Sequence, residues 1–250
     1  MNRVLLDSNI FEGSWVSAQT GYGIIIKSHN QDGNCPYCFT QDVTFTNNIV
    51  KNITSTIMIQ GTESYNDWNK LTPFTKRVKI ENNLFYNDPT WPEKITRGIT
   101  IFNYSSDVQI NHNTIFSTTN TLVANYEDDT RIPNFVLTNN ILERGYGGLG
   151  NVKEGKGYLD TYFPNYVYQK NGLINSSANF PDGLVGNDYL KRMYPESSVI
   201  TSIGSEGFVD AANGNYSLNS SSPFKGAGTD GKDIGVDMQV LNNAVAGVKT

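Results

Sequence analysis

Two polar stretches of the sequence hold side chains that could carry out acid–base chemistry. The candidate catalytic residues are Lys27, His29, Asp32, Asp128, Asp129 and Arg131. A glycosidase requires two carboxyl groups, about 5.5 Å apart for retention of configuration or about 6.5–9.5 Å apart for inversion. Asp128 could form such a pair with Asp129 or with Asp32. A polysaccharide lyase instead requires a base, such as Lys27, His29 or Arg131, and a cation or an arginine that neutralises the substrate carboxylate.

A third polar stretch adds aromatic side chains to these charged ones. The candidates for substrate binding are Glu63, Tyr65, Asp67, Trp68 and Tyr126, and Asp67 offers Asp128 a further carboxyl partner. An aromatic ring stacks on the apolar face of a sugar while carboxylates take hydrogen bonds from its hydroxyls. The combination favours a carbohydrate ligand, although each of these side chains taken singly is also typical of a solvated loop.

The segment Cys35-Pro36-Tyr37-Cys38 has the spacing of a thiol-redox motif. That chemistry requires a thiolate of low pKa at a helix N-terminus, whereas the surrounding residues predict loop and strand. We therefore favour a disulfide between Cys35 and Cys38 that staples the loop, with two free thiols as the alternative. A structural zinc site requires four ligands, which the two cysteines and His29 do not supply, so no metal site is predicted there.

A repeated motif must position these loops. In order, the motif consists of an apolar residue, any residue, an apolar residue, two polar residues and an asparagine, with a further apolar residue one or two places on. Its clearest copy is 43–50. The others are 4–10, 78–84, 108–115, 135–141 and, more weakly, 166–173. The motif asparagines are Asn9, Asn48, Asn83, Asn113, Asn140 and Asn171, at steps of 39, 35, 30, 27 and 31 residues. A fixed motif at a variable step indicates repeating strands joined by loops of different length.

Each copy alternates apolar and polar residues, which predicts a strand with one buried face. The asparagine tolerates the left-handed conformation of a sharp bend, and its amide can bond to the asparagine of the next layer. A second strand follows the bend in most copies, at 23–26, 57–59, 98–101 and 122–124. These features predict an all-β, single-stranded parallel solenoid of about six coils. An antiparallel sandwich is the alternative, but it would show hairpin signals.

The pattern resembles the right-handed parallel β-helix superfamily, the pectate-lyase-like proteins, in which inward apolar stacks and an asparagine ladder recur. Segments 18–21 and 30–33, with the proline at 36, are similar to a group of secreted bacterial β-helix proteins. The resemblance implies a right-handed β-helix located outside the cell or on its surface. It does not fix the activity, because the superfamily hosts lyases, glycosidases, esterases, epimerases, tailspikes and adhesins. The sequence lacks the Gly-His-Gly, Asn-Thr-Asp and paired-Asp patterns of polygalacturonases and the Arg-rich strand of pectate lyases.

The end of the chain resembles the closing segment of many bacterial β-helix proteins. We therefore expect 1–204 to form the coils with their loop insertions, and 205–250 to finish the last coil and cover its open end. Asp230, Asp233 and Asp237 could hold calcium, whose preferred ligands are hard oxygens, but turn formation explains them equally well, so no cofactor is predicted. A short helix is predicted at 188–194, and His112 is expected to hydrogen-bond within its own turn.

The composition and net charge of the chain argue against some classes of binding partner. The chain has 250 residues, 17% of them charged, and a formal net charge of −5; clustered Lys and Arg for phosphate binding are missing, which argues against nucleic acid. No apolar run is long enough for a membrane helix, so membrane insertion is not expected. Met1-Asn2-Arg3 leads straight into a repeat, so there is no secretion signal, and we expect a mature or truncated piece of a longer protein. The oligomeric state is not predicted.

Insertions at the same point of successive coils emerge at the same edge of a solenoid. Loops 27–42, 60–77 and 125–134 should therefore crowd together, and the compact turn at 102–107 should leave a groove between them. We predict an extracellular carbohydrate-interacting protein whose groove binds a polysaccharide and, if catalytic, cleaves it as a lyase or a glycoside hydrolase. The alternative is a non-catalytic surface, adhesion or polysaccharide-binding module, or a fragment of a larger β-helix protein.

Overall fold

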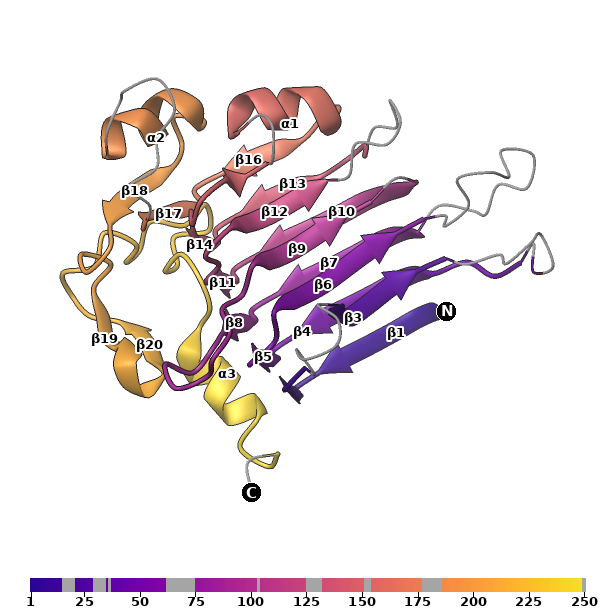
Figure 1. Cartoon of the computed structure of the whole chain (residues 1–250), viewed down its shortest axis with the longest axis horizontal. Helices are drawn as coiled ribbons and strands as arrows, with labels where there is room; N and C mark the ends of the chain where they lie inside the picture. Colours follow the sequence, from indigo (N-terminus) through magenta and orange to yellow (C-terminus); the bar gives the residue numbers. More distant parts are fainter. Residues whose placement is uncertain are drawn as a thin grey trace.

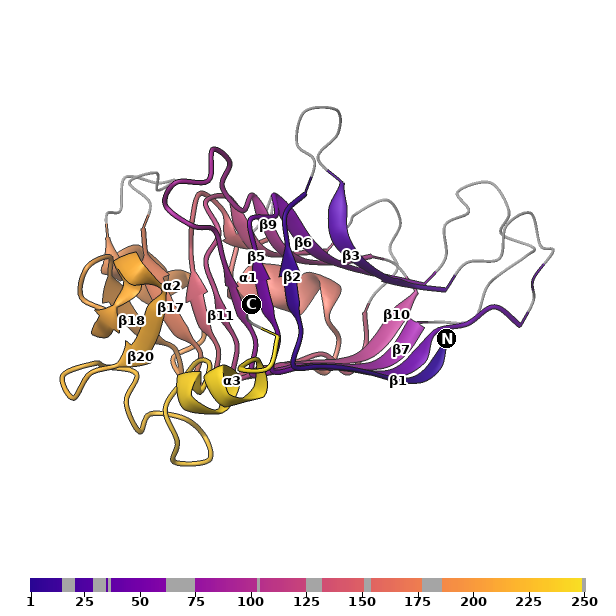
Figure 2. The same ribbon diagram turned by 90° about the horizontal axis from the view of Figure 1, so that it is seen from below.

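The computed structural model describes residues 1–14, 21–28, 35, 37–61, 75–102, 104–124, 132–150, 154–176 and 186–248. Strands account for 42% of the structure and helices for 12%. Most strands belong to three parallel sheets that wind around a common axis (Figures 1 and 2). The predicted all-β parallel solenoid is therefore confirmed.

The first sheet contains the strands of the repeated motif. In spatial order they are β1 (Asn2–Asp7), β4 (Gln41–Thr46), β7 (Thr75–Glu81), β10 (Ser105–Asn111), β13 (Val136–Thr138) and β16 (Val167–Gln169). Equivalent residues of neighbouring coils pair directly, so that Val4 faces Val43 and Val43 faces Val78. Because successive side chains of a strand point to opposite faces, the apolar residues form columns inside the coil.

The second and third sheets follow after two bends. The second contains β2 (Ile10–Glu12), β5 (Ile49–Lys51), β8 (Leu84–Tyr86), β11 (Thr114–Ile115), β14 (Ile141–Glu143), β17 (Gly172–Asn175) and β18 (Val199–Ser202). The third contains β3 (Tyr22–Lys27), β6 (Ser55–Gln60), β9 (Arg97–Ile101), β12 (Asn120–Ala124) and β15 (Gly148–Leu149). In the described residues the sixth motif copy adds no strand to the third sheet, and the solenoid makes about four turns, slightly fewer than the six coils predicted.

The space between the sheets is filled by one apolar cluster. Phe45 and Phe85 are fully buried in adjacent coils, with ring centroids 6.5 Å apart. Phe45 also meets Phe11 of the first coil at 5.5 Å. Burying side chains of this size stabilises the fold by about 1.5–3 kcal/mol each, so the stacked columns are a main source of cohesion between coils.

The motif asparagines form the predicted ladder at the bend between the first and second sheets. The backbone N–H and the Nδ2 of Asn48 both donate to Oδ1 of Asn83, at 2.8 and 3.1 Å. The same pair of bonds joins every neighbouring pair from Asn9 to Asn171. From Asn48 onward the ladder asparagines are fully buried, where unpaired amides would be costly.

The left-handed residue of this bend is not the ladder asparagine but the residue before it. Those residues are Ser8, Asn47, Asn82, His112, Asn139 and Lys170, with φ between 51° and 62°. This corrects the interpretation that one asparagine both bends the chain and bonds to the next layer. One residue supplies the bend, and its successor supplies the amide.

Two short helices, α1 (Lys156–Tyr162) and α2 (Asn187–Met193), lie across the C-terminal end of the coil (Figure 1). Leu159 of α1 and Leu190 of α2 are buried in the same cluster as the coil interior. The position of α2 agrees with the short helix predicted at 188–194. Its Asp188 in the first turn has the charge that the helix dipole favours there.

The closing segment (205–248 in the described residues) lies along the side of the coil, on the outer face of the second sheet (Figure 2). Its elements are β19 (Phe208–Asp210), the 3₁₀ helix η3 (Ala211–Asn213), β20 (Asn215–Leu218) and α3 (Met238–Ala244). β19 and β20 pair antiparallel. Leu241 of α3 belongs to one cluster with Ile49 and Leu84 of the second sheet. The closing segment thus packs beside the coils, and α1 and α2 occupy the end where the sequence placed it.

Candidate functional site

The strands of the third sheet end at one edge, as the register argument predicts. Lys27 pairs with Gln60, and Ile59 pairs with Ile101, which in turn pairs with Ala124. The chain therefore leaves β3, β6 and β12 on the same side of the coil. The three long insertions start from this common edge.

Of the predicted groove residues, Lys27 alone is described. Its carbonyl oxygen accepts a hydrogen bond from Oγ1 of Thr40 at 2.6 Å. The others lie outside the described residues: His29, Asp32, Glu63, Tyr65, Asp67, Trp68, Tyr126, Asp128, Asp129 and Arg131. The groove and its carboxylate pairs stay predictions.

Cys35 and Cys38 are joined by a disulfide, with Cα atoms 5.3 Å apart. The backbone N–H of Cys38 donates to the carbonyl oxygen of Cys35 at 3.0 Å, so the bridge closes a tight turn. Tyr37, inside the turn, is 86% exposed. Disulfides persist mainly in oxidising compartments.

The closing segment creates a hollow on each side of β20. The larger, with a volume of about 700 Å³, we term the ladder cleft, and Ser217 lines it. The smaller, about 230 Å³, we term the aromatic pocket, and Tyr216 lines it. Because successive side chains of a strand point to opposite sides, one strand separates the two hollows.

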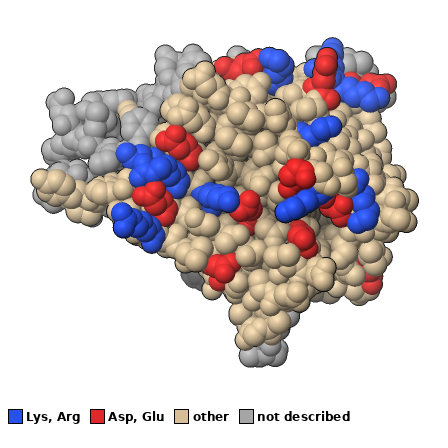
Figure 3. Space-filling view, turned by 180° about the vertical axis from the view of Figure 1, so that it is seen from behind, with Lys and Arg blue, Asp and Glu red and all other residues tan. Residues whose placement is uncertain are grey.

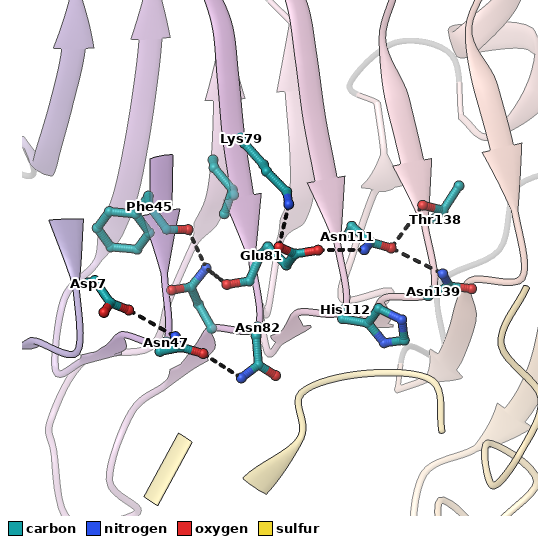
Figure 4. A network of polar contacts seen from close by, with 12 residues as sticks. Asp7, Phe45, Asn47, Lys79, Glu81, Asn82, Asn111, His112, Thr138 and Asn139 are labelled. Atoms are coloured by element: carbon teal, nitrogen blue, oxygen red, sulfur yellow. Dashed lines mark hydrogen bonds and ion pairs between the residues drawn. The ribbon is translucent and has the colours of Figure 1, made fainter. Parts of the chain in front are cut away.

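The coil wall of the ladder cleft consists of polar side chains from the end of the first-sheet strands and from the left-handed positions (Figure 4). The Nδ2 of Asn47 donates to Oδ1 of Asp7, and the Nδ2 of Asn82 donates to Oδ1 of Asn47, both at 2.8 Å. Asn82 also accepts the backbone N–H of Asp237 at 2.7 Å. This outer amide row therefore binds both the neighbouring coils and the closing segment.

The carboxylates that line the ladder cleft are already engaged. Burial raises the pKa of Glu81, but hydrogen bonds from Lys79 at 2.5 Å and Asn111 at 3.0 Å outweigh it, so the pKa lies below its ordinary value. Asp233 accepts from Nζ of Lys225 at 2.9 Å. Asp237 caps α3 by accepting two backbone N–H groups. A general acid must hold a proton at the working pH, and this set of carboxylates is not arranged for that role.

His112 fastens the closing segment to the coil. Its Nδ1 lies 3.2 Å from the carbonyl oxygen of Gly235, and its Nε2 lies 3.2 Å from Oδ2 of Asp230. These partners are 123 and 118 residues further along the chain. The expectation that His112 bonds within its own turn is therefore wrong.

The aspartates considered as calcium ligands also have protein partners. Asp230 accepts from the backbone N–H of Lys232 at 3.1 Å in addition to its contact with His112. Asp233 accepts the backbone N–H of Gly226 at 2.9 Å. Within the described ranges, no group of three or more His, Cys, Asp and Glu residues could hold a metal ion. These aspartates form turns and a helix cap.

The aromatic pocket combines ring faces with a few polar groups. The ring of Phe116 lies 4.8 Å from that of Tyr216, and Tyr86 lies 5.5 Å from Tyr216, measured between centroids. Polar lining comes from Asn87, Lys94, Ser117, Thr118 and Glu143. This is the combination of aromatic faces and hydrogen-bonding groups that the sequence predicted in the exit loops, built here from other residues.

Glu143 is the carboxyl group of the aromatic pocket. Burial raises its pKa above the ordinary value, and the negative charge of Glu206 raises it further. Hydrogen bonds from Ser176 and from the backbone N–H of Ser117, the latter at 3.2 Å, lower the pKa by less. The pKa of Glu143 therefore lies above that of an exposed glutamate, and its carboxyl group accepts the backbone N–H of Ser117 at the pocket wall.

The motif itself could have located this pocket. Tyr86, Phe116 and Glu143 each stand three places after a ladder asparagine. Tyr86 and Glu143 end strands of the second sheet, and Phe116 directly follows β11. Lys51 occupies the same position one coil earlier and forms an ion pair with Glu12 at 3.1 Å. The third residue after each ladder asparagine thus lies on the outer face of the second sheet. The sequence-based prediction of the site did not use this regularity.

The fold and its hollows define a parallel β-solenoid with a laterally packed closing segment. Comparison of the chain with protein-family models, with curated proteins and with solved structures found no match. Among the helices of the described residues, none is long and apolar enough to cross a membrane. The chemistry of the two hollows is therefore the basis for the proposed function.

Proposed function

We propose that this protein binds a polysaccharide and that the aromatic pocket holds one of its sugar rings. We further propose a right-handed β-helix of the pectate-lyase-like kind, acting outside the cell or on its surface. The observation that carries the proposal is the conjunction of Tyr86, Phe116 and Tyr216 with the carboxyl group of Glu143, whose pKa burial raises, in one pocket.

The size and lining of the pocket suit a single pyranose ring. A volume of about 230 Å³ is smaller than the usual range of about 300–1,000 Å³ for drug-sized ligands. An aromatic wall offers a stacking surface for the C–H face of a sugar. Lys94 at the rim, which is exposed, supplies a donor for hydroxyl or carboxylate oxygens, and Glu143 inside adds a carboxyl group for hydrogen bonds to hydroxyls.

The same lining favours binding over hydrolysis. Hydrolysis of a glycosidic bond by the common mechanism requires two carboxyl groups. Among the described residues that line the aromatic pocket, Glu143 is the sole carboxyl group. A lyase or glycosidase activity would therefore depend on the exit-loop candidates, and it remains the second form of the proposal.

The disulfide supports the proposed location. A bridge between Cys35 and Cys38 is stable in oxidising surroundings such as the cell exterior. Polysaccharides of cell walls and matrices are found in that compartment, so the partner and the redox state agree with each other.

Binding to a panel of plant, algal and microbial glycans tests the proposal, with affinities measured by calorimetry for each ligand found. Replacing Tyr86 by leucine removes a stacking surface and should raise the dissociation constant about tenfold, or about 1.4 kcal/mol. Tyr166→Leu is the matched control, because Tyr166 is half-buried beside α1, where its hydroxyl donates to Asp160 at 3.0 Å. Equal losses in both variants, or no binding to any glycan, would contradict the proposal.

Reducing ends and unsaturated uronates in the same mixtures report on cleavage. Glu143→Gln keeps the shape of the side chain and a donor but cannot release a proton. Products that persist in this variant would place the chemistry at the exit edge, whereas binding without products would favour the non-catalytic module.

A further inference from the structure

Charged side chains in this molecule are commonly paired. Glu154, a buried carboxylate, accepts hydrogen bonds from Nε and Nη2 of Arg144 at 2.8 and 2.9 Å. At the surface Asp42 forms an ion pair with Arg77, and Figure 3 shows positive and negative side chains next to each other across one face of the molecule. A buried carboxylate without such a partner is costly, because burial disfavours the charged form.

Glu143 and Glu206 are carboxyl groups without such a partner. Glu143 is half-buried in the aromatic pocket, and Glu206 is buried. Among the described residues, neither forms an ion pair. The donors to Glu143 are neutral groups, the backbone N–H of Ser117 and the side chain of Ser176. Burial raises the pKa of Glu143, and the negative charge of Glu206 adds to the rise, so this side of the coil has an excess of carboxyl groups.

The aromatic rings beside Glu143 are suited to a cation. The ring planes of Phe116 and Tyr216 are tilted by 38°, and those of Tyr86 and Tyr216 by 61°. The face of an aromatic ring carries partial negative charge and attracts a cation within about 6 Å of the ring centroid. Because neighbouring centroids are 4.8 and 5.5 Å apart, one ammonium group in the pocket can lie within that distance of two rings.

Lys94 is the positively charged side chain of the pocket lining. It is exposed at the rim, and it lowers the pKa of Glu143 by less than Glu206 raises it. An acidic sugar would bring a further negative charge to Glu143 and Glu206, with the exposed Lys94 as its counter-charge. A cationic sugar would instead meet two carboxyl groups and the ring faces. The electrostatics of the pocket therefore favour a positive ligand.

We propose that the sugar in the aromatic pocket is an amino sugar, whose ammonium group lies between the aromatic rings and the carboxylate of Glu143. This inference rests on the proposed function and names the class of its ligand. In glucosamine an ammonium group replaces one hydroxyl of glucose, so the ring keeps its size and gains a positive charge. The sugar ring still stacks on Tyr86, and its charge compensates the carboxyl groups of Glu143 and Glu206.

Two oligosaccharides of equal length and linkage test the inference: a neutral cello-oligosaccharide and the corresponding oligomer of glucosamine, whose amines are charged at mildly acidic pH. Calorimetry should give a dissociation constant about tenfold lower for the glucosamine oligomer. Glu143→Gln keeps the shape of the side chain but removes its charge, and should abolish this preference. Glu196→Gln makes the same change at an exposed glutamate outside the pocket lining and should leave the preference intact.

Lys94→Gln keeps the test decisive if Glu143→Gln fails to fold, because Lys94 is exposed. Removal of its like charge should tighten binding of the glucosamine oligomer about threefold. Equal affinities for the two oligomers, a preference that persists in Glu143→Gln or is lost equally in Glu196→Gln, or weaker binding of the glucosamine oligomer by Lys94→Gln would overturn this inference and leave the proposed function standing. Failure to bind any glycan would overturn both.

Discussion

Two buried polar systems hold this molecule together, and they follow opposite designs. The asparagine ladder is neutral and repeated, and each layer makes the same bonds as the next. The C-terminal end instead has one charged pair, in which Nε and Nη2 of Arg144 donate to the carboxylate of Glu154 at 2.8 and 2.9 Å. The side chains of Arg144 and Glu154 are 1% and 10% exposed.

The comparison shows that the ladder spreads its stabilisation over repeated layers, whereas the charged pair stabilises the molecule at one place. The neighbours of every ladder asparagine make the same hydrogen bonds as it does, so loss of one layer leaves the bonds of the other layers intact. Glu154 accepts hydrogen bonds from Tyr189 at 2.9 Å and from Tyr194 at 2.7 Å as well as from Arg144. These groups join α2 to the coil at one point, and no second copy can replace them.

The largest effect is expected for Glu154→Gln, which leaves the buried charge of Arg144 without its partner. We expect a loss of about 3–5 kcal/mol in the free energy of unfolding, measured by urea denaturation. Burial and the charge of Glu154 raise the pKa of Tyr189 to about 12, so ultraviolet titration of the variant should show that pKa falling.

The double variant Arg144→Met/Glu154→Leu is the control for the charged pair. Removal of both charges should cost less than removal of one, because no buried ion is left unpaired. A double variant as unstable as Glu154→Gln would show that shape, and not charge compensation, dominates at this end.

The next effect is expected for Asn83→Ala in the middle of the ladder. The substitution removes the donors to the carbonyl oxygens of Phe45 and Glu81, at 3.0 and 2.9 Å, and the acceptor for Asn48. Leaving these buried groups unpaired should cost about 2–4 kcal/mol in the free energy of unfolding. Asn9→Ala removes fewer bonds and should cost about 1 kcal/mol; equal losses at both positions would mean that the number of ladder bonds does not set the cost.

A smaller effect, visible through its pH dependence, is expected for Glu143→Gln. Since burial raises the pKa of Glu143 in the folded protein, the folded state binds the proton more tightly than the unfolded chain does. The contribution of this group to stability is therefore greatest below the ordinary carboxyl pKa and falls as pH rises through the raised value. Glu143→Gln cannot ionise, so its unfolding midpoint should change less between about pH 4 and about pH 8. Parallel pH profiles for the two proteins would contradict the raised pKa.

The sequence was sufficient to predict the repeated asparagine ladder and insufficient to predict the single pair of Arg144 and Glu154. The ladder and the strands before it could be predicted because each copy of the motif restates the same register. Helix α2 could be predicted as well, with Asp188 in its first turn and Lys191 in its last. Helix α1 has Gly155 at its N-cap, with no side-chain cap and no acidic residue in the first turn, so local signals do not mark it.

In the candidate site, too, the features that follow from the repeat were predicted, and those that depend on distant contacts were not. The common exit edge of the third sheet follows from register and was predicted, although the residues expected there lie mostly outside the described ranges. The two hollows depend on the closing segment, whose contacts join residues as far apart as Asn82 and Asp237, 155 positions along the chain. Local patterns do not encode such contacts, so the partners of His112 and the wall that Tyr216 adds to the aromatic pocket could be placed only by the structure.

The smallest effect is expected for the ion pair between Arg77 and Asp42, which lies at the surface. Arg77 and Asp42 form the same two-bond contact as Arg144 and Glu154, but their side chains are 45% and 34% exposed. The hydrogen bond from Arg77 lowers the pKa of Asp42, so any stabilisation exists above the ordinary carboxyl pKa and is lost as pH falls. Asp42→Asn should shift the unfolding midpoint only slightly at low ionic strength, and about 1 M salt should remove the difference by screening. A shift as large as that of Glu154→Gln, or one that persists in high salt, would mean that solvent exposure does not set the strength of these contacts.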